Sequence, residues 1–319
     1  MILDLGLDLH RMSSIESFRK FVSLFALAIF CVAANGSGCR SKTVETSAPV
    51  EVRRVTDDLG RTVSVPVTIT RAISLAPSIT ESVFAVGAAD RLVGVTTYCN
   101  YPEQAKSIPK VGDTLTPNLE TIVALKPDVV FVSTASQIEA FKDTLEQNGI
   151  AVYVTNPTSI EGVLSDLMKL GELFGTVDKT AVLLNDLQSR LDEVSQRVNG
   201  EQRPGVFLQI SKEPLFTIGK QSFLTAIIEK AGGRSVTADI ESSYPKLSKE
   251  TALALNPDAI ILSASDDNRV VNDVFKNSPA IKKGKVFSID ADLLSRPGPR
   301  LVDGLEEIAR DIHPDKFVQ

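Results

Sequence analysis

Residues 120–133 read ETIVALKPDVVFVS, and residues 250–263 read ETALALNPDAIILS. The two stretches agree at seven of fourteen positions without a gap, at a constant offset of 130 residues. Each predicts a short helix that stops before a proline and continues into a buried strand, because proline disfavours a helical residue before it and the last residues are apolar. The duplicated unit therefore predicts two related α/β lobes.

Both copies carry a residue of capping type two positions before the glutamate, Asn118 in the first and Ser248 in the second. Asparagine and serine at a helix N-cap accept a hydrogen bond from a backbone N–H of the first turn. We therefore expect Glu120 and Glu250 in the first turn of their helices, where a carboxylate also complements the helix dipole.

The segments around the repeats predict the remaining parts of the two lobes. Apolar runs bounded by turn residues predict strands, and apolar positions three or four apart predict helices. Ser78 and Glu81 have the spacing of a capping box, which predicts a helix that ends near Gly87. The expected elements are a hairpin of residues 51–56 and 62–68, strands 71–75, 91–96, 206–210 and 286–289, a helix at 223–230, and a last helix after residues 296–300.

A mostly helical pattern covers residues 159–199 and is interrupted between Gly171 and Gly175. It predicts a stiff connector between the lobes. The expected fold class is α/β, with two Rossmann-like lobes joined by a long rigid interlobe helix. The expected divisions are a signal peptide at 1–38, a tether at 39–51, an N-terminal lobe at 52–158, a helical connector at 159–202 and a C-terminal lobe at 203–319.

The N-terminal residues predict export. Residues 19–20 are basic and precede an apolar run at 21–34, which is short for a membrane span and is followed by small residues. Met12 is an alternative start, because the segment that it opens supplies a basic region by itself. Cleavage before Cys39 would give a lipid-anchored protein, the preferred form, and cleavage after Ala34 a free one. Either predicts a location in the periplasm or on the outer face of the membrane.

The composition argues against several classes of function. A formal net charge of −6 and a pI of about 5.2 provide no basic surface for nucleic acid. In the expected lobes Cys99 is the one cysteine and His313 the one histidine, so neither a disulfide, a usual zinc site nor a Ser-His-Asp triad is expected. The glycine motifs of dinucleotide and phosphate binding do not occur. We expect no enzyme, no cofactor and no metal site.

Several stretches match a known family: TYCNYP at 97–102, residues 118–128, FLQ at 207–209, FTIGK at 216–220 and RPGPR at 296–300. With the two-lobe pattern, they resemble the periplasmic binding proteins for vitamin B12 and iron complexes that feed ABC importers, over roughly residues 52–315. The 97–102 and 216–220 segments are most similar to the vitamin B12-binding branch. The resemblance implies a class III periplasmic binding protein fold with cobalamin or a related corrinoid held between the lobes.

The resemblance also implies which residues contact the ligand. They are Tyr98, Phe216, Tyr244, Asp292, Thr114 and Ser133. The aromatic positions would supply flat apolar faces for a macrocycle, and Asp292 a polar contact. Thr114 and Ser133 stand where the vitamin-binding relative has large aromatics, and the sequence contains no tryptophan. An iron–siderophore complex and haem therefore stay as alternative ligands.

In the same family an acidic residue on each lobe pairs with arginines of the membrane permease. The matching residues are Glu120 and Glu250, the first residues of the two repeats. The expected partners are an ABC permease dimer with its ATPase, the ligand, and the membrane through an anchor on Cys39. We expect a monomer. The alternatives outside this family are an envelope α/β enzyme and a ligand-free signalling or adhesion protein.

Overall fold

The computed structural model describes residues 51–134, 136 and 138–318. The expected signal peptide, Cys39 and all but the last residue of the expected tether lie outside these residues. The strands are β1 (Val52–Thr56), β2 (Thr62–Pro66), β3 (Ala72–Ser74), β4 (Leu92–Val95), β5 (Val129–Ser133), β6 (Ala151–Thr155), β7 (Gly205–Ser211), β8 (Phe216–Thr217), β9 (Arg234–Ser235), β10 (Ala259–Ala264) and β11 (Val286–Asp290). The helices are α2 (Pro77–Ala85), α3 (Leu119–Ala124), α4 (Lys142–Gln147), α5 (Ile160–Phe174), α6 (Val177–Arg197), α7 (Phe223–Lys230), α8 (Lys249–Leu255), α9 (Pro279–Lys282), α10 (Ala291–Ser295) and α11 (Leu301–Ile312).

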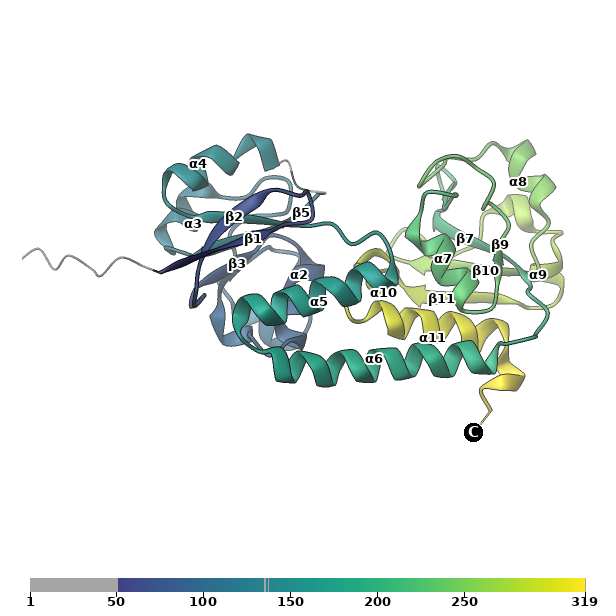
Figure 1. Cartoon of the computed structure of the whole chain (residues 1–319). Coiled ribbons are helices and arrows are strands. Elements are labelled where there is room, and N and C mark those ends of the chain that lie inside the picture. Colours follow the sequence, from purple (N-terminus) through teal and green to yellow (C-terminus); the bar gives the residue numbers. More distant parts are fainter. Residues whose placement is uncertain (1–50, 135, 137, 319) are drawn as a thin grey trace, which may run out of the picture. The chain divides into compact units, whose positions relative to one another are not determined.

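The N-terminal lobe contains a parallel sheet in the order β4-β3-β5-β6, preceded by the antiparallel hairpin β1-β2 (Figure 1). Strand β5 is buried along most of its length, as expected of a parallel sheet that is covered on both faces. The hairpin turns through Gly60 at φ 74°, and the Asp58 N–H donates to the Val154 carbonyl of β6 at 3.1 Å. The predicted hairpin and strands of this lobe are confirmed.

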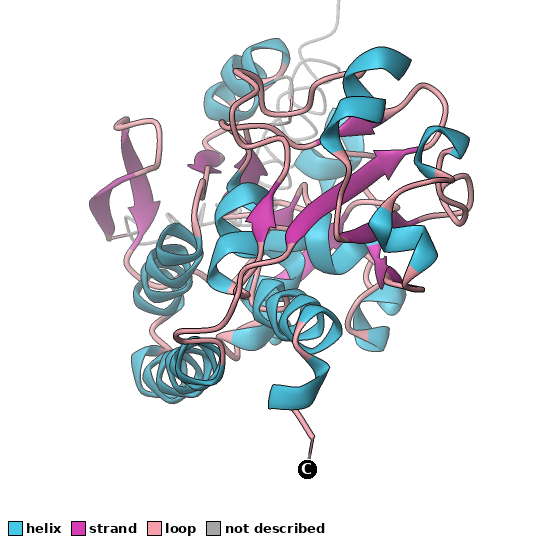
Figure 2. Ribbon diagram, turned by 90° about the vertical axis from the view of Figure 1, so that its right-hand side faces the viewer, coloured by secondary structure: helices cyan, strands magenta, loops and turns pink. Residues whose placement is uncertain are grey.

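The C-terminal lobe contains a second sheet in the order β11-β10-β7-β8, with β9 beside β7. Strands β9, β10 and β11 run in the same direction as β7, and the short strand β8 runs opposite to it. Figure 2 shows helices flanking the strands of this sheet. Helix α7 starts at Ser222, whose hydroxyl accepts from the Leu224 N–H. The predictions for residues 206–210, 223–230 and 286–289 are confirmed.

The duplicated sequence is duplicated in the backbone as well. Asn118 and Ser248 are the N-caps of α3 and α8, and each side chain accepts from the N–H three residues on, at 3.0 and 3.1 Å. Both helices are followed by a left-handed residue at φ 46°, Lys126 in one lobe and Asn256 in the other. A proline and a buried strand then follow in each. The sequence repeat is therefore a structural repeat.

The connector segment forms two helices. Gly175, in the left-handed conformation at φ 70°, ends α5 before α6 begins. The Glu172 and Leu173 carbonyls of α5 accept hydrogen bonds from Arg53 of β1, at 3.0 and 2.7 Å. Helix α5 therefore packs on the N-terminal lobe.

Helix α6 is the element that joins the lobes (Figure 1). Near its start, Lys179 lies so close to Gly87 of the N-terminal lobe that a Cβ there would be 2.8 Å from the lysine Cδ. Just past its end, Val198 lies against Gly232 of the C-terminal lobe, where a Cβ would be 2.8 Å from the valine Cβ. Arg190 in the second half of α6 pairs with Asp303 and Glu306 of α11, at 2.5 and 2.8 Å. The expected rigid interlobe helix is thus α6 alone.

The predicted capping box at the start of α2 is wrong. The helix begins at Pro77, whose missing N–H suits a first helical position, and the N-cap Ala76 offers no side-chain bond. The Glu81 side chain does not reach back to the helix start, because two arginines of the C-terminal lobe bind it. Among the described residues, no helix has the length and apolar character needed to cross a bilayer.

Candidate ligand site

A cavity of about 790 Å³ lies between residues of the two lobes. This volume is in the upper part of the range usual for small-molecule sites. On the N-terminal side, Ser78 follows β3, Tyr98 follows β4, Ser133 ends β5 and Thr155 ends β6. The carboxyl ends of parallel strands meet at one edge of a sheet, so these four positions converge although they are far apart in the sequence.

The C-terminal side of the cavity comes from three segments. Gln221 and Phe223 lie at the start of α7, Tyr244 lies in the loop before α8, and Asp292 and Arg296 lie in and just after α10. Helix α10 directly follows β11, so this lobe also contributes the carboxyl end of one of its parallel strands. The cavity is therefore built from strand ends and loops of both lobes.

Most of the predicted ligand residues come together at this cavity. Its lining includes Tyr98, Thr114, Ser133, Tyr244 and Asp292. Phe216 is not part of the lining: it is half-buried in β8, where its backbone pairs with β7 and with Lys246. The C-terminal lobe presents Phe223 to the cavity in place of Phe216.

Sequence reasoning missed Phe223 and the segment from Thr155 to Thr158. The pattern at Phe223 predicts only a helix, and nothing local shows that the first residue of α7 faces the cavity. Thr155 is the last residue of a buried strand and Asn156 follows it, and the strand-end rule for open α/β sheets could have found them. Asn156 is held in place from two sides, since its N–H donates to Asp58 at 2.6 Å and its side-chain oxygen accepts from Thr134 at 2.6 Å.

The cavity wall is rich in hydroxyl groups and carries little net charge. Its hydroxyl side chains, besides those of the two tyrosines, are Ser78, Thr114, Ser133, Thr134, Thr155, Thr158, Ser222, Ser243 and Ser295. Its charged side chains are Asp292 and Arg296, which form an ion pair with each other at 2.6 Å. Among the described residues, no three His, Cys, Asp or Glu side chains are grouped to hold a metal ion. The wall is suited to an uncharged polar ligand with flat apolar surfaces.

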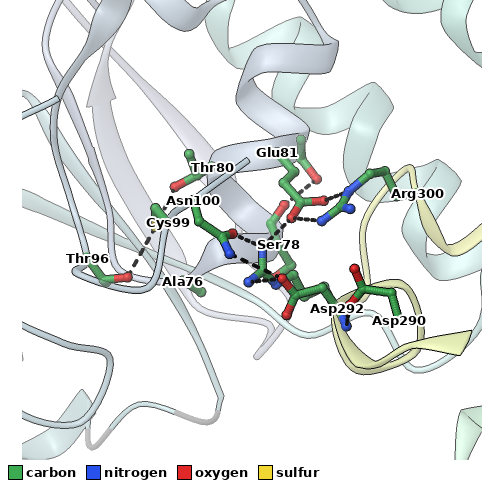
Figure 3. Close-up of polar contacts among 12 residues, drawn as sticks. Ala76, Ser78, Thr80, Glu81, Thr96, Cys99, Asn100, Asp290, Asp292 and Arg300 are labelled. Atoms are coloured by element: carbon green, nitrogen blue, oxygen red, sulfur yellow. Dashed lines mark hydrogen bonds and ion pairs between the residues drawn. The ribbon is translucent and has the colours of Figure 1, made fainter. Parts of the chain in front are cut away.

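An ion-pair network joins the two lobes beside this cavity (Figure 3). Glu81 of α2 is almost fully buried and accepts two hydrogen bonds from Arg300, at 2.8 and 2.7 Å. It also pairs with Arg296 at 2.7 Å, and Arg296 donates to Asn100 at 2.8 Å. The bond to Glu81 raises the pKa of Arg300 above its ordinary value. The Arg300 guanidinium lies over the ring of Tyr101, 3.9 Å from its centre.

Cys99 lies behind the cavity wall and does not line the cavity. Its sulfur is buried between the hydroxyl groups of Thr80 and Thr96, each at 3.1 Å (Figure 3). The thiol therefore fills a small buried space as part of a hydroxyl network.

Glu120 and Glu250 lie away from the cavity, on exposed first turns of α3 and α8. The Glu250 N–H and the hydroxyl of Ser248 lower the pKa of the Glu250 carboxyl. Each lobe therefore presents a carboxylate to solvent at the matching position of the repeat.

Comparison with known proteins agrees with this architecture. Residues 73–293 match the family model described as periplasmic binding protein. The chain is 31% identical over 303 residues to an uncharacterized ABC transporter substrate-binding lipoprotein, YvrC, of Bacillus subtilis, covering 91% of this chain and 96% of the relative. It is 30% identical over 245 residues to the vitamin B12-binding protein of Vibrio vulnificus, covering 75% and 89%.

A solved structure of the periplasmic heme-binding protein BhuT with two hemes superposes with a TM-score of 0.69 at 25% identity, covering 77% of this chain and 98% of that one. The fold is therefore that of the class III periplasmic binding proteins. The predicted membership of the family that includes the vitamin B12-binding proteins is confirmed. Members of this family bind solutes and are not enzymes. The chain belongs to the periplasmic binding protein family.

Proposed function

We propose that this protein captures cobalamin or a closely related corrinoid in the interlobe cavity and delivers it to an ABC permease. The observation that carries the choice of ligand is the neutral, hydroxyl-rich wall with aromatic residues at both sides. Tyr98 from one lobe and Tyr244 and Phe223 from the other supply apolar ring faces. Hydroxyl groups donate to and accept from the amide groups that surround a corrin ring. The vitamin B12-binding relative supports the same choice.

The charge of the wall is the argument against the alternative ligands. Haem carries two carboxylates, and many ferric siderophore complexes are anionic, so unpaired cationic groups in a site favour these ligands. The one arginine in this lining is already bound by Glu81 and Asp292. Haem nevertheless stays the second candidate, because the structure with the TM-score of 0.69 is a heme-binding protein.

Calorimetric titration of the protein without its signal segment tests the ligand. Cyanocobalamin is the probe, with haemin and a ferric siderophore as controls. We expect one-to-one binding of cyanocobalamin with a Kd below about 1 μM. Binding of haemin or the siderophore without binding of cyanocobalamin would replace the corrinoid by that ligand.

Glu120 and Glu250 are the proposed contacts with the permease. Both are exposed, both lie at the same position of the structural repeat, and neither lines the cavity. Two equivalent carboxylates on two lobes match the two-fold symmetry of a permease dimer, and such rim charges orient the encounter. The ATPase that drives uptake is a separate chain.

The proposed location is outside the inner membrane, with a lipid on Cys39. The Bacillus subtilis relative is a lipoprotein, and Cys39 follows the apolar run and small residues of the expected signal segment. Labelling of cells with a fatty-acid analogue should mark the wild-type protein and leave Cys39→Ala unmarked. Equal labelling of both, or a mature N-terminus at Asn35, would refute the anchor.

A further inference from the structure

Four charged side chains meet where the cavity reaches the seam between the lobes. Glu81 comes from α2 of the N-terminal lobe, and Asp292, Arg296 and Arg300 come from the segment after β11 of the C-terminal lobe. Figure 3 shows Glu81 and Arg300 facing each other, with Asp292 and Asn100 beside them. Two carboxylates and two guanidinium groups leave this cluster with no net charge.

The carboxylates hold Arg296 from two directions. One terminal nitrogen donates to Glu81 and to Asn100 at 2.7 and 2.8 Å, and the other contacts Asp292 at 2.6 Å. The side chain of Arg296 is 11% exposed and that of Glu81 is 1% exposed. Arg296 lines the cavity, so a bound ligand meets a guanidinium whose charge is already compensated.

Holding the lobes together does not by itself account for all four groups. The bidentate ion pair between Glu81 and Arg300 already links α2 to the C-terminal lobe. Arg296 and Asp292 form a second pair that faces the cavity. Burying additional ion pairs is costly, and apolar residues of similar size often stabilise a protein as well or better. A function at the cavity wall explains why this second pair is present.

We propose that Glu81 and Asp292 are specificity-determining residues that neutralise Arg296 and so make the cavity select uncharged ligands over anionic ones. The inference deepens the proposed function and rests on it for the identity of the ligand. An amide-bearing macrocycle meets no unpaired charge at this wall. A carboxylate-bearing ligand has to displace Asp292 from Arg296 or lie beside a carboxylate, which is unfavourable.

Asp292→Asn is the first variant, because this side chain is 32% exposed and its loss leaves the Glu81–Arg300 bond intact. Affinity is measured for cyanocobalamin and for a cobalamin monocarboxylic acid, in which one peripheral amide is hydrolysed. We expect the ratio of the two dissociation constants to shift toward the acid by on the order of tenfold. Glu81→Gln should shift the ratio in the same direction.

Asp303→Asn is the matched control. It also removes one carboxylate from an arginine pair at the lobe seam, at Arg190, but Asp303 does not line the ligand cavity. In this variant the ratio of the two dissociation constants should equal that of the wild type. An equal shift in the control would assign the effect to net charge and overturn the proposal.

Tyrosine fluorescence gives a readout that needs no ligand. The sequence has four tyrosines and no tryptophan, and Tyr98 and Tyr244 line the cavity while Tyr153 is buried. The quenching constant is measured for iodide, an anion, and for acrylamide, which is neutral, and the iodide constant is divided by the acrylamide constant. The quotient should rise in Asp292→Asn and stay constant in Asp303→Asn. Glu81→Gln is tested by the affinity ratio alone, because it also removes the partner of Arg300, which lies over the exposed Tyr101.

The two readouts separate the possible failures. If the wild type does not bind cyanocobalamin, the corrinoid proposal fails and the iodide quotient still decides whether Asp292 neutralises the cavity wall. If cyanocobalamin binds but neither the affinity ratio in the two variants nor the iodide quotient in Asp292→Asn changes, the specificity proposal is wrong and the proposed function stands.

Discussion

The two lobes share a repeated unit but contribute opposite net charges to the ion-pair cluster between them. In both, a capped helix ends at a left-handed residue and a proline before a buried strand. The N-terminal lobe supplies the buried carboxylate Glu81 from a helix that follows its first sheet strand. The C-terminal lobe supplies Arg296 and Arg300 from the segment before its last helix.

The repeat accounts for the features that the two lobes share, and the charged groups at the cavity are features in which the lobes differ. The repeat places a carboxylate on the exposed surface of each lobe, at Glu120 and Glu250, where a symmetric partner would need equal groups. The cavity between the lobes needs complementary groups, and these lie outside the repeat. In the proposed function, the symmetric positions contact the permease and the asymmetric positions contact the ligand.

The largest expected effect comes from removing the two symmetric carboxylates, Glu120 and Glu250. Glu120→Ala combined with Glu250→Ala should abolish ligand uptake by cells while the Kd for ligand in solution stays unchanged, since neither residue lines the cavity. Transport assays and calorimetry on the same variants check this. The single variants should be impaired to similar extents, and a fall in ligand affinity would move these residues from docking to the site.

The next largest effect concerns Glu81, which has no counterpart among the residues of the repeat. Glu81→Ala should lower the free energy of unfolding by about 3–5 kcal/mol, because it leaves the largely buried Arg300 without a carboxylate and Arg296 with Asp292 alone. Urea unfolding measures the loss. Asp303→Ala, at a partly exposed pair, should cost only about 0–1 kcal/mol. Equal losses in the two variants would mean that the Glu81 cluster is not a special link between the lobes.

A third effect is a pH dependence of stability that arises at Asp166 of α5, on the N-terminal lobe. Burial, and then the charge of Asp58, raise the pKa of Asp166 from its ordinary value of 3.8 to about 7. Lys169 contacts both carboxylates, at 2.5 Å from Asp58 and 3.3 Å from Asp166, and the other Asp166 oxygen has no hydrogen-bond partner among the described residues. A carboxyl that binds its proton more tightly when folded gives stability that is fully present below about pH 4 and is lost as the pH rises to about 7.

Asp166→Asn should remove this pH dependence. The neutral amide imitates the protonated acid, so the variant should match the wild type near pH 4 and exceed its stability at pH 8, by on the order of 1 kcal/mol. Thermal unfolding at the two pH values checks the difference. A variant that is less stable than the wild type at pH 8 would show that the charged Asp166 is needed beside Lys169.

The smallest effect compares the two copies of the repeat directly. Lys126 and Asn256 both have φ 46°, a conformation that asparagine tolerates better than lysine. Lys126→Asn should stabilise the protein by about 0.5–1 kcal/mol, and Asn256→Lys should destabilise it by a similar amount. Denaturant midpoints measured with unchanged slopes test this pair. Changes of the same sign would show that the side chains, and not the backbone, dominate at these positions.

Much of the fold follows from local sequence. The capped starts of α3 and α8, the hairpin at Gly60 and the buried strands β5 and β10 depend on residues a few positions apart. Five of the six residues assigned to the cavity by family resemblance also line it. The capping box expected at Ser78 and Glu81 is wrong because distant arginines bind Glu81, and Phe216, which the family resemblance assigned to the ligand, does not line the cavity.

The sequence by itself determined the two-lobe α/β class, the repeat and the strand ends that carry Tyr98, Ser133 and Asp292. Periodicity and capping are local properties, and parallel strands bring their carboxyl ends together whatever lies between them. Only the tertiary structure decided that Phe223 faces the cavity and that Glu81 binds arginines more than 200 positions away. Contacts of that separation depend on how the two lobes meet, which no local pattern encodes.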